Sequence, residues 1–336
     1  MAYTTIDDPS AYFQTTLYSG TGSQQSITNG GNSDLQPDWL WIKERDGTSS
    51  HQIMDAVRLY YNRIESNNDS AQLDAGQTGA TNQNVTSFDS DGFGVKNGGA
   101  VNASGDTYVA WQWKESATAG FDICSWTGNG SAQNISHNLS KVPTMIIVKN
   151  RTDAGADWYI YNVHNGNTHS MILNTNTAKV GAYSDNWNNT TPTSSVFTVG
   201  SSNSTGGSSS DNMIAYVFTD IKGYSKFGSY TGNGNADGTF VYTGFKPAFI
   251  IVKKTNAAED WELFDNKRLG YNVDNNNVVP NTTSAEATSD RLDIVSNGFK
   301  FRTAAGSVNA SGDSFIYMAF AENPFTTSTG VPATAR

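Results

Sequence analysis

Three short sequence patterns recur in the same order along this chain, about 105 residues apart. The first is an aromatic residue followed by a Gly-x-Gly turn, at residues 18–22, 126–130 and 230–234. The second is a proline followed by an apolar run that ends in lysine, at residues 37–43, 143–149 and 247–253. The third is an aspartate that opens an aromatic-rich run, at residues 106–113, 211–218 and 313–320. Because three separate patterns share one period, the sequence predicts a triplicated unit.

Each unit has the pattern of an antiparallel β-protein. Short continuous apolar runs, such as residues 146–148 and 249–252, are typical of central sandwich strands. Asn-Gly and Asp-Gly pairs favour tight turns between such strands. A period near 105 residues exceeds a solenoid repeat or a propeller blade and matches a complete β-sandwich. No segment shows sustained helical periodicity, and a short helix over residues 53–64 is an alternative.

The sequence therefore predicts an all-β fold of three tandem antiparallel β-sandwich repeats, of the jelly-roll or concanavalin-like type. Because the linkers at residues 115–120 and 220–223 are short, neighbouring domains should touch. The predicted division is an N-terminal docking arm, three β-sandwich repeats and a C-terminal tail, at residues 1–12, 13–117, 118–222, 223–325 and 326–336.

The first and third repeats resemble each other more than either resembles the second. Both contain Val-Asn-Ala-Ser-Gly-Asp, at residues 101–106 and 308–313, whereas the second has a serine-rich loop at residues 200–210. We therefore expect the three units to share a scaffold and to differ in role. Binding is expected at the loops that diverge between the repeats, since the repeated residues mark strands and turns.

Composition excludes several classes of protein. Only 15% of the residues are charged, well below the ~25% of an average soluble domain, so Asn, Ser, Thr and Gly supply the polar surface. A net charge of −10 argues against nucleic-acid binding, which needs clustered Lys and Arg. The single cysteine, Cys124, excludes an intramolecular disulfide and is predicted to be a buried, inert thiol. Neither a signal peptide nor a transmembrane segment is expected.

No catalytic motif emerges from the sequence. Nucleophile-elbow, Walker and dinucleotide-binding patterns are missing, and His164 and His169 fit no zinc spacing, so they are predicted to be solvated loop residues. Two acid pairs, Asp89 with Asp91 and Glu259 with Asp260, could serve glycoside hydrolysis, but they lie in turns that favour aspartate. The turn at residues 89–92 also has a weak similarity to a calcium loop. We expect no enzyme, no cofactor and no metal site.

Structural roles are predicted for the recurring polar and aromatic residues. Trp39, Trp41, Trp111 and Trp113 should pack in the core. The repeated lysines should carry their charge from strand ends to the surface; they are Lys43, Lys149 and Lys253. Asp106 and Asp313 should be turn residues whose carboxylates accept backbone N–H groups.

The phrase at residues 87–95, followed by the run at residues 102–114, resembles a recurring domain of tailed-phage virion proteins, especially those of marine phages. The proline-to-lysine strand belongs to the same resemblance, which covers all three units. It implies a virion structural or tail-fibre-like protein with β-sandwich domains. Because the shared motifs mark strands and turns, the resemblance assigns no functional residues.

We therefore expect a non-enzymatic phage virion protein of the tail-fibre or appendage type, assembled in the host cytoplasm. It would present β-sandwich domains for attachment to a host-surface glycan. The expected partners are other virion proteins (portal, tail, capsid or fibre base) and further copies of the chain, with a trimer favoured. A capsid or tail decoration, cement or knob protein is the alternative, and a polysaccharide depolymerase is a lesser one.

Overall fold

The computed structural model describes residues 3–74, 84–181, 183–269 and 272–333, and they form an all-β fold. Helical structure in these ranges is confined to single turns: η1 (Pro9–Ala11), α1 (Gly99–Asn102), α2 (Ser184–Trp187) and α3 (Gly306–Asn309). The alternative of a helix over residues 53–64 is wrong. That stretch contains the end of strand β4 (Gln52–Asp55) and strand β5 (Asn62–Arg63), because its apolar residues pair with strands on both sides.

Three antiparallel sheets have the same strand order. We call residues 13–117, 118–222 and 223–325 the first, second and third segments. The first segment forms the sheet β1 (Phe13–Ser19), β9 (Thr107–Trp113), β3 (Trp39–Glu44) and β4. The second forms β10 (Phe121–Thr127), β17 (Asn212–Phe218), β12 (Met145–Asn150) and β13 (Tyr159–Asn162), extended by β14 (His169–Ile172) and β15 (Val180–Gly181). The third forms β18 (Ser225–Thr231), β25 (Ser314–Pro324), β20 (Phe245–Lys254) and β21 (Glu262–Asp265).

An outer sheet lies over each of these inner sheets. The first outer sheet is β2 (Gln25–Thr28), β8 (Gly92–Val95) and β7 (Val85–Asp89), and the second is β11 (Gln133–Ser136) and β16 (Val196–Val199). The third is β19 (Phe240–Tyr242), β24 (Gly298–Phe301), β23 (Ala287–Val295) and β22 (Asp274–Asn277). A separate pair joins β5 to β6 (Leu73–Asp74). In each segment, apolar residues of the inner and outer sheets meet in a core of that segment's own.

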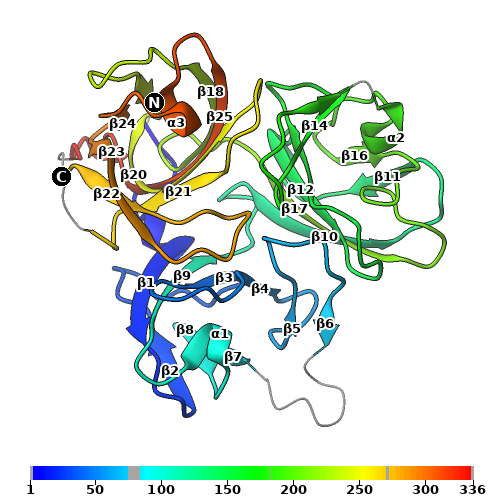
Figure 1. Ribbon diagram of the computed structural model, residues 1–336, viewed down its shortest axis with the longest axis horizontal. Helices are drawn as coiled ribbons and strands as arrows, with labels where there is room; N and C mark the ends of the chain where they lie inside the picture. Colours follow the sequence, from blue (N-terminus) through cyan, green and yellow to red (C-terminus); the bar gives the residue numbers. More distant parts are fainter. Residues whose placement is uncertain (1–2, 75–83, 182, 270–271, 334–336) are drawn as a thin grey trace.

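The opposite faces of the three inner sheets meet in one central core that draws on every segment. Trp39 stacks on Tyr216 of the second segment with ring centroids 4.6 Å apart, and Phe13 stacks on Phe320 of the third at 5.4 Å. Figure 1 shows the result: the blue-to-cyan, green and yellow-to-red parts of the chain surround a common centre. The four tryptophans predicted to lie in the core are fully buried there, which confirms that prediction; they are Trp39, Trp41, Trp111 and Trp113.

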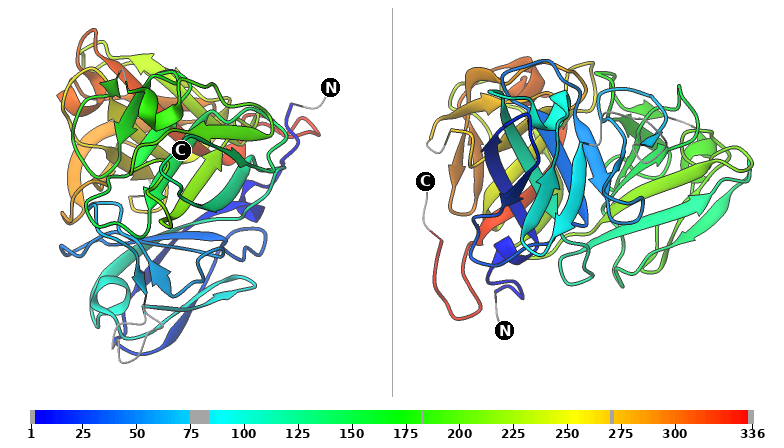
Figure 2. Two further views of the ribbon diagram at one scale, coloured as in Figure 1. Left: turned by 90° about the vertical axis from the view of Figure 1, so that its right-hand side faces the viewer. Right: turned by 90° about the horizontal axis from the view of Figure 1, so that it is seen from below.

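The described residues near both chain ends lie at the third segment and its junction with the second, and the right-hand view of Figure 2 shows the red loop near the C-terminus beside the blue N-terminal segment. The Tyr3 hydroxyl donates to the Gly244 carbonyl at 2.7 Å, and buried Thr4 donates to the Lys222 carbonyl at 2.9 Å. The Asp7 carboxylate accepts the Ser328 backbone N–H at 2.6 Å, which joins the two ends. The segment predicted to be a docking arm thus makes its described contacts within its own chain, and a docking role remains a prediction.

Candidate functional site

The three repeated lysines are buried, so the prediction that they carry their charge to the surface is wrong. Each Nζ atom donates to two backbone carbonyls: Lys43 to Glu44 and Gly47, Lys149 to Asp69 and Ala156, and Lys253 to Asn176 and Glu259. Burial lowers the pKa of each ammonium to about 8. These lysines hold loops in place and offer no group to a ligand.

The other titratable residues that the sequence singled out are dispersed. His164 is exposed, as predicted, whereas His169 is half-buried in β14, so it is not a solvated loop residue. Asp91 accepts the Leu35 N–H and Asp260 accepts from the Asn281 amide, which are structural turn bonds. Cys124 is buried as predicted, and burial raises the pKa of its thiol.

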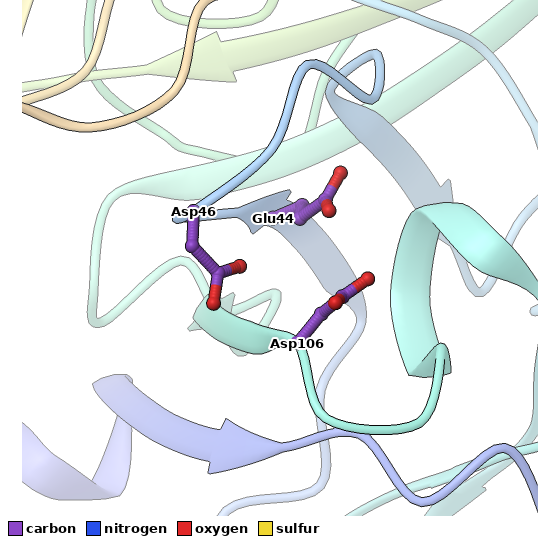
Figure 3. A group of neighbouring side chains, drawn as sticks. All are labelled: Glu44, Asp46 and Asp106. Atoms are coloured by element: carbon purple, nitrogen blue, oxygen red, sulfur yellow. The ribbon is translucent and has the colours of Figure 1, made fainter.

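One group of carboxylates does converge, at the loop-side end of β3 and β9. Oxygen atoms of Glu44, Asp46 and Asp106 lie within 4.8 Å of one another (Figure 3). Glu44 is buried and its Oε2 accepts the Ser49 N–H at 3.1 Å, while Asp46 accepts the Thr107 N–H. Burial, then the neighbouring carboxylates of Glu44 and Asp46, raise the pKa of Asp106. Carboxylate oxygens are the ligands that Ca²⁺ prefers, although it usually takes six to eight oxygens.

The repeated aspartate of this group has a different neighbour in each segment. In the second, Asp211 accepts from the Asn150 amide at 2.8 Å; in the third, Asp313 forms an ion pair with Lys254 at 2.6 Å. Asp313 also accepts from the Asn256 side chain, so its predicted role as an acceptor of backbone N–H groups is wrong. The side chain that bonds to this aspartate therefore differs between the segments. Among the described residues, only the first segment brings three acidic side chains together.

A cleft of about 360 Å³ lies where the second and third segments meet. Its aromatic side is β19, where Phe240 and Tyr242 are 47% and 49% exposed. Its polar side includes His164 and Asp220 of the second segment and Lys226 of the third. Large aromatic side chains with this much exposure on one strand are unusual for a surface without a ligand. This cleft is the candidate binding site.

A larger hollow of about 540 Å³ lies where the third and first segments meet, between β1 and residues of β20, β25 and the turn after β21. Thr15 lines it, yet its buried hydroxyl has no hydrogen-bond partner among the described residues. The strand pairings place Thr15 opposite Trp111, as Ile123 lies opposite Tyr216 and Phe227 opposite Met318. Two segments thus put an apolar side chain where the first has threonine.

Thr15→Val is therefore expected to raise the free energy of unfolding by about 1–2 kcal/mol. The change removes a buried hydroxyl that forms no hydrogen bond and keeps the side-chain shape. Urea denaturation followed by tryptophan fluorescence measures the difference. Thr15→Ser, which keeps the hydroxyl and loses a methyl group, should be less stable than the wild type. Equal or lower stability of the valine variant would show that the hydroxyl has a partner.

The fold and these sites define an all-β protein with a shared apolar core and a surface of polar loops and outer sheets. Within the described residues, no helix is long and apolar enough to cross a membrane. Residues 8–324 match the sequence model of a family described as a domain of unknown function, DUF7483, and the chain belongs to this family. The match runs through all three segments as one unit. No curated protein sequence matches the chain.

Proposed function

We propose that this chain is a non-enzymatic phage virion protein of the tail-fibre or appendage type that presents β-sandwich domains to a host-surface glycan. Its fold would be three tandem β-sandwich repeats of about 105 residues, of the jelly-roll or concanavalin-like type, joined through one central core. The recurring strand order of the inner sheets and the outer sheet over each of them support this organisation.

The observation that carries the glycan-binding part of the proposal is the exposed aromatic pair Phe240 and Tyr242 beside a polar cleft. Sugar rings present C–H groups that pack on aromatic faces and hydroxyls that need hydrogen-bonding partners. An aromatic platform next to polar side chains offers both kinds of contact. The shared core supports this role because a rigid scaffold holds the recognition surface in place.

The virion part of the proposal rests on the resemblance of the recurring motifs to tailed-phage virion proteins. Its partners would be portal, tail, capsid or fibre-base proteins and further copies of the chain, with three-fold symmetry favoured. A decoration, cement or knob role is the second candidate. The compact arrangement around one core favours it, since the helices of the described ranges are single turns and supply no fibre shaft.

Two measurements on phage particles and on purified protein test the proposal. A cryo-EM map of the virion, with mass spectrometry of washed particles, should show the chain on an appendage exposed to the host. A map that places it on the capsid shell would establish the decoration role instead. Host polysaccharide incubated with the protein should bind without being shortened. Cleavage that a single Asp→Asn change abolishes would identify a depolymerase and overturn the non-enzymatic assignment.

A further inference from the structure

Strands β2 and β11 occupy the place of β19 in the first and second segments, and they contain no aromatic residue, so they provide an internal comparison for β19. Val241 pairs with Phe299 in the third segment in the same way that Ile135 pairs with Phe197 and Ile27 with Phe93. The exposed positions on either side of Val241, Ile135 and Ile27 are therefore equivalent. They are Phe240 and Tyr242 in the third segment, Asn134 and Ser136 in the second, and Ser26 and Thr28 in the first.

Small polar residues at these positions are what an exposed strand face normally carries, because successive side chains point to opposite sides of a sheet. The first and second segments show that the strand folds well with them. The third segment replaces both with aromatic residues that remain about half exposed. Their contribution to the core is therefore small, and a role outside folding explains both replacements.

Tyr317 of the inner sheet also lines this cleft, and it occurs together with a glycine at the position opposite it. Gly228 lies opposite Tyr317 in the third segment, where the first has Thr16 opposite Ala110 and the second has Cys124 opposite Ala215. A Cβ atom at Gly228 would lie 2.4 Å from the Tyr317 hydroxyl, so the glycine makes room for the phenol. Both Gly228 and Tyr317 line the cleft.

Neighbouring residues hold Tyr242, one of the two rings of the platform. Lys226 donates to the Tyr242 carbonyl at 2.9 Å, and its Nζ atom lies 5.4 Å from the centroid of the Tyr242 ring. The Tyr3 hydroxyl lies 3.3 Å from that of Tyr242. A side chain fixed before binding loses less conformational entropy when the ligand arrives, so Tyr242 is preorganised.

Polar groups of both segments line the rest of the cleft. Asp220 Oδ1 accepts the Phe227 N–H at 3.0 Å and the Thr144 hydroxyl at 3.2 Å, and its second oxygen has no protein donor within the described ranges. His164 and Ser229 are exposed beside it. The lining thus offers hydrogen bonds together with one carboxylate, Asp220, and one ammonium, Lys226. Acidic ligands are usually held by clusters of Arg and Lys, which this lining lacks.

We propose that this cleft binds a neutral saccharide, with a pyranose ring stacked on the Phe240–Tyr242 platform and its hydroxyls bonded to Asp220 and Ser229. The inference deepens the proposed function, on which it rests, by assigning the site and the chemical class of the glycan. A volume of about 360 Å³ is at the small end of ligand pockets, so a short saccharide unit or chain end fits better than a long segment.

The test begins with an array that holds neutral glucan, mannan and galactan oligosaccharides together with uronate- and sialate-containing ones. Isothermal titration calorimetry of the best neutral oligosaccharide then compares the wild type with the variant Phe240→Ser/Tyr242→Thr. This variant carries the residues of the first segment, so it should fold, which circular dichroism and thermal unfolding verify. Affinity should fall at least about tenfold, the usual effect of truncating aromatic anchor residues.

Tyr183→Ser is the matched control, because Tyr183 is a 54% exposed aromatic residue that does not line the cleft. Its affinity should equal that of the wild type. Neutral saccharide binding that survives the double variant would overturn this site and leave the proposed function intact. A preference for acidic glycans that the double variant abolishes would overturn the neutral class and keep the site. Failure of the wild type to bind any glycan on the array would overturn both proposals.

Discussion

Replacing Asp55 by asparagine is expected to lower the free energy of unfolding by about 3–5 kcal/mol, the range for breaking a buried ion pair. Asp55 and Arg58 are both fully buried, and their side chains form an ion pair at 2.6 Å. The Tyr216 hydroxyl donates to the same carboxylate at 2.7 Å, which links the first segment to the second. The variant leaves the Arg58 guanidinium as a buried charge without its counter-ion, and it weakens a bond between segments.

Urea denaturation of the full chain measures this loss, and the second segment supplies the comparison. At the equivalent positions it has Asn162 and Asn165, and the residue equivalent to Tyr216 in the neighbouring segment is Met318. The double variant Asp55→Asn/Arg58→Asn copies this neutral arrangement and should be less damaging than Asp55→Asn alone. Asp237→Asn, which breaks the exposed pair with Lys300, should leave the stability almost unchanged because solvent screens that pair. A single variant as stable as the double one would contradict the explanation.

A second buried ion pair, with a hydrogen bond to a neighbouring segment, joins the third segment to the first. Asp265 pairs with Arg268 at 2.6 Å and accepts the Trp111 indole N–H at 3.1 Å. Burial alone would raise the pKa of Asp265, but the Arg268 guanidinium brings it below the ordinary value. Tryptophan and tyrosine can donate to a carboxylate and methionine cannot. The Asp–Arg pair accordingly occurs in the first and third segments, where Tyr216 or Trp111 of a neighbouring segment donates to the carboxylate. The second segment has Asn162 at the equivalent position.

The all-β class and the main strands could be predicted from the sequence because they depend on local patterns. Apolar runs, Gly turns and the strand-opening aspartates can each be recognised in a short stretch of sequence. The arrangement of the three segments could not be predicted. It depends on contacts such as Trp39 with Tyr216, which join residues far apart in the chain and have no local signature. Each inner sheet is consequently buried on both faces, with one face in the core of its own segment and the other in the central core.

The candidate cleft had a signal in the sequence that was missed. Aligning the repeats on the central residue of β19 shows two aromatic residues, Phe240 and Tyr242, where the other units have Ser, Thr and Asn. The sequence expectation placed binding in the divergent loops, so it did not point to this strand. Sequence alone could not tell that these side chains face solvent, because the exposed face of β19 is determined by how the outer sheet covers the inner one.

The repeated lysines show why a recurring charge at a strand end was misread. A lysine there usually extends its stem along apolar surface and places its ammonium in water. Here a loop from the preceding segment covers two of the strand ends. The Lys149 Nζ atom donates to the carbonyl of Asp69 in the first segment at 2.9 Å, and Lys253 donates to that of Asn176 in the second at 3.1 Å. The lysine recurs in all three units because each buried Nζ atom donates to two backbone carbonyls.

Lys149→Met is therefore expected to lower the free energy of unfolding by about 2–4 kcal/mol, because the Asp69 and Ala156 carbonyls lose their buried donor. Methionine keeps most of the volume of the lysine stem, so the loss reports the hydrogen bonds. Urea denaturation measures the stability, and hydrogen exchange should show faster opening of the loop around residue 69. Lys141→Met, at an exposed lysine of the same segment, should change the stability by less than about 0.5 kcal/mol.

The dependence of stability on pH separates this explanation from a simple packing defect. Burial lowers the pKa of Lys149 to about 8 in the folded chain, against about 10.4 for an exposed lysine. Between these values the unfolded chain binds more protons, so the lysine's contribution to stability rises with pH. The difference in stability between the wild type and Lys149→Met should therefore widen from pH 7.5 to pH 9.5. A constant difference across that range would mean that Lys149 keeps an ordinary pKa and is exposed to water in solution.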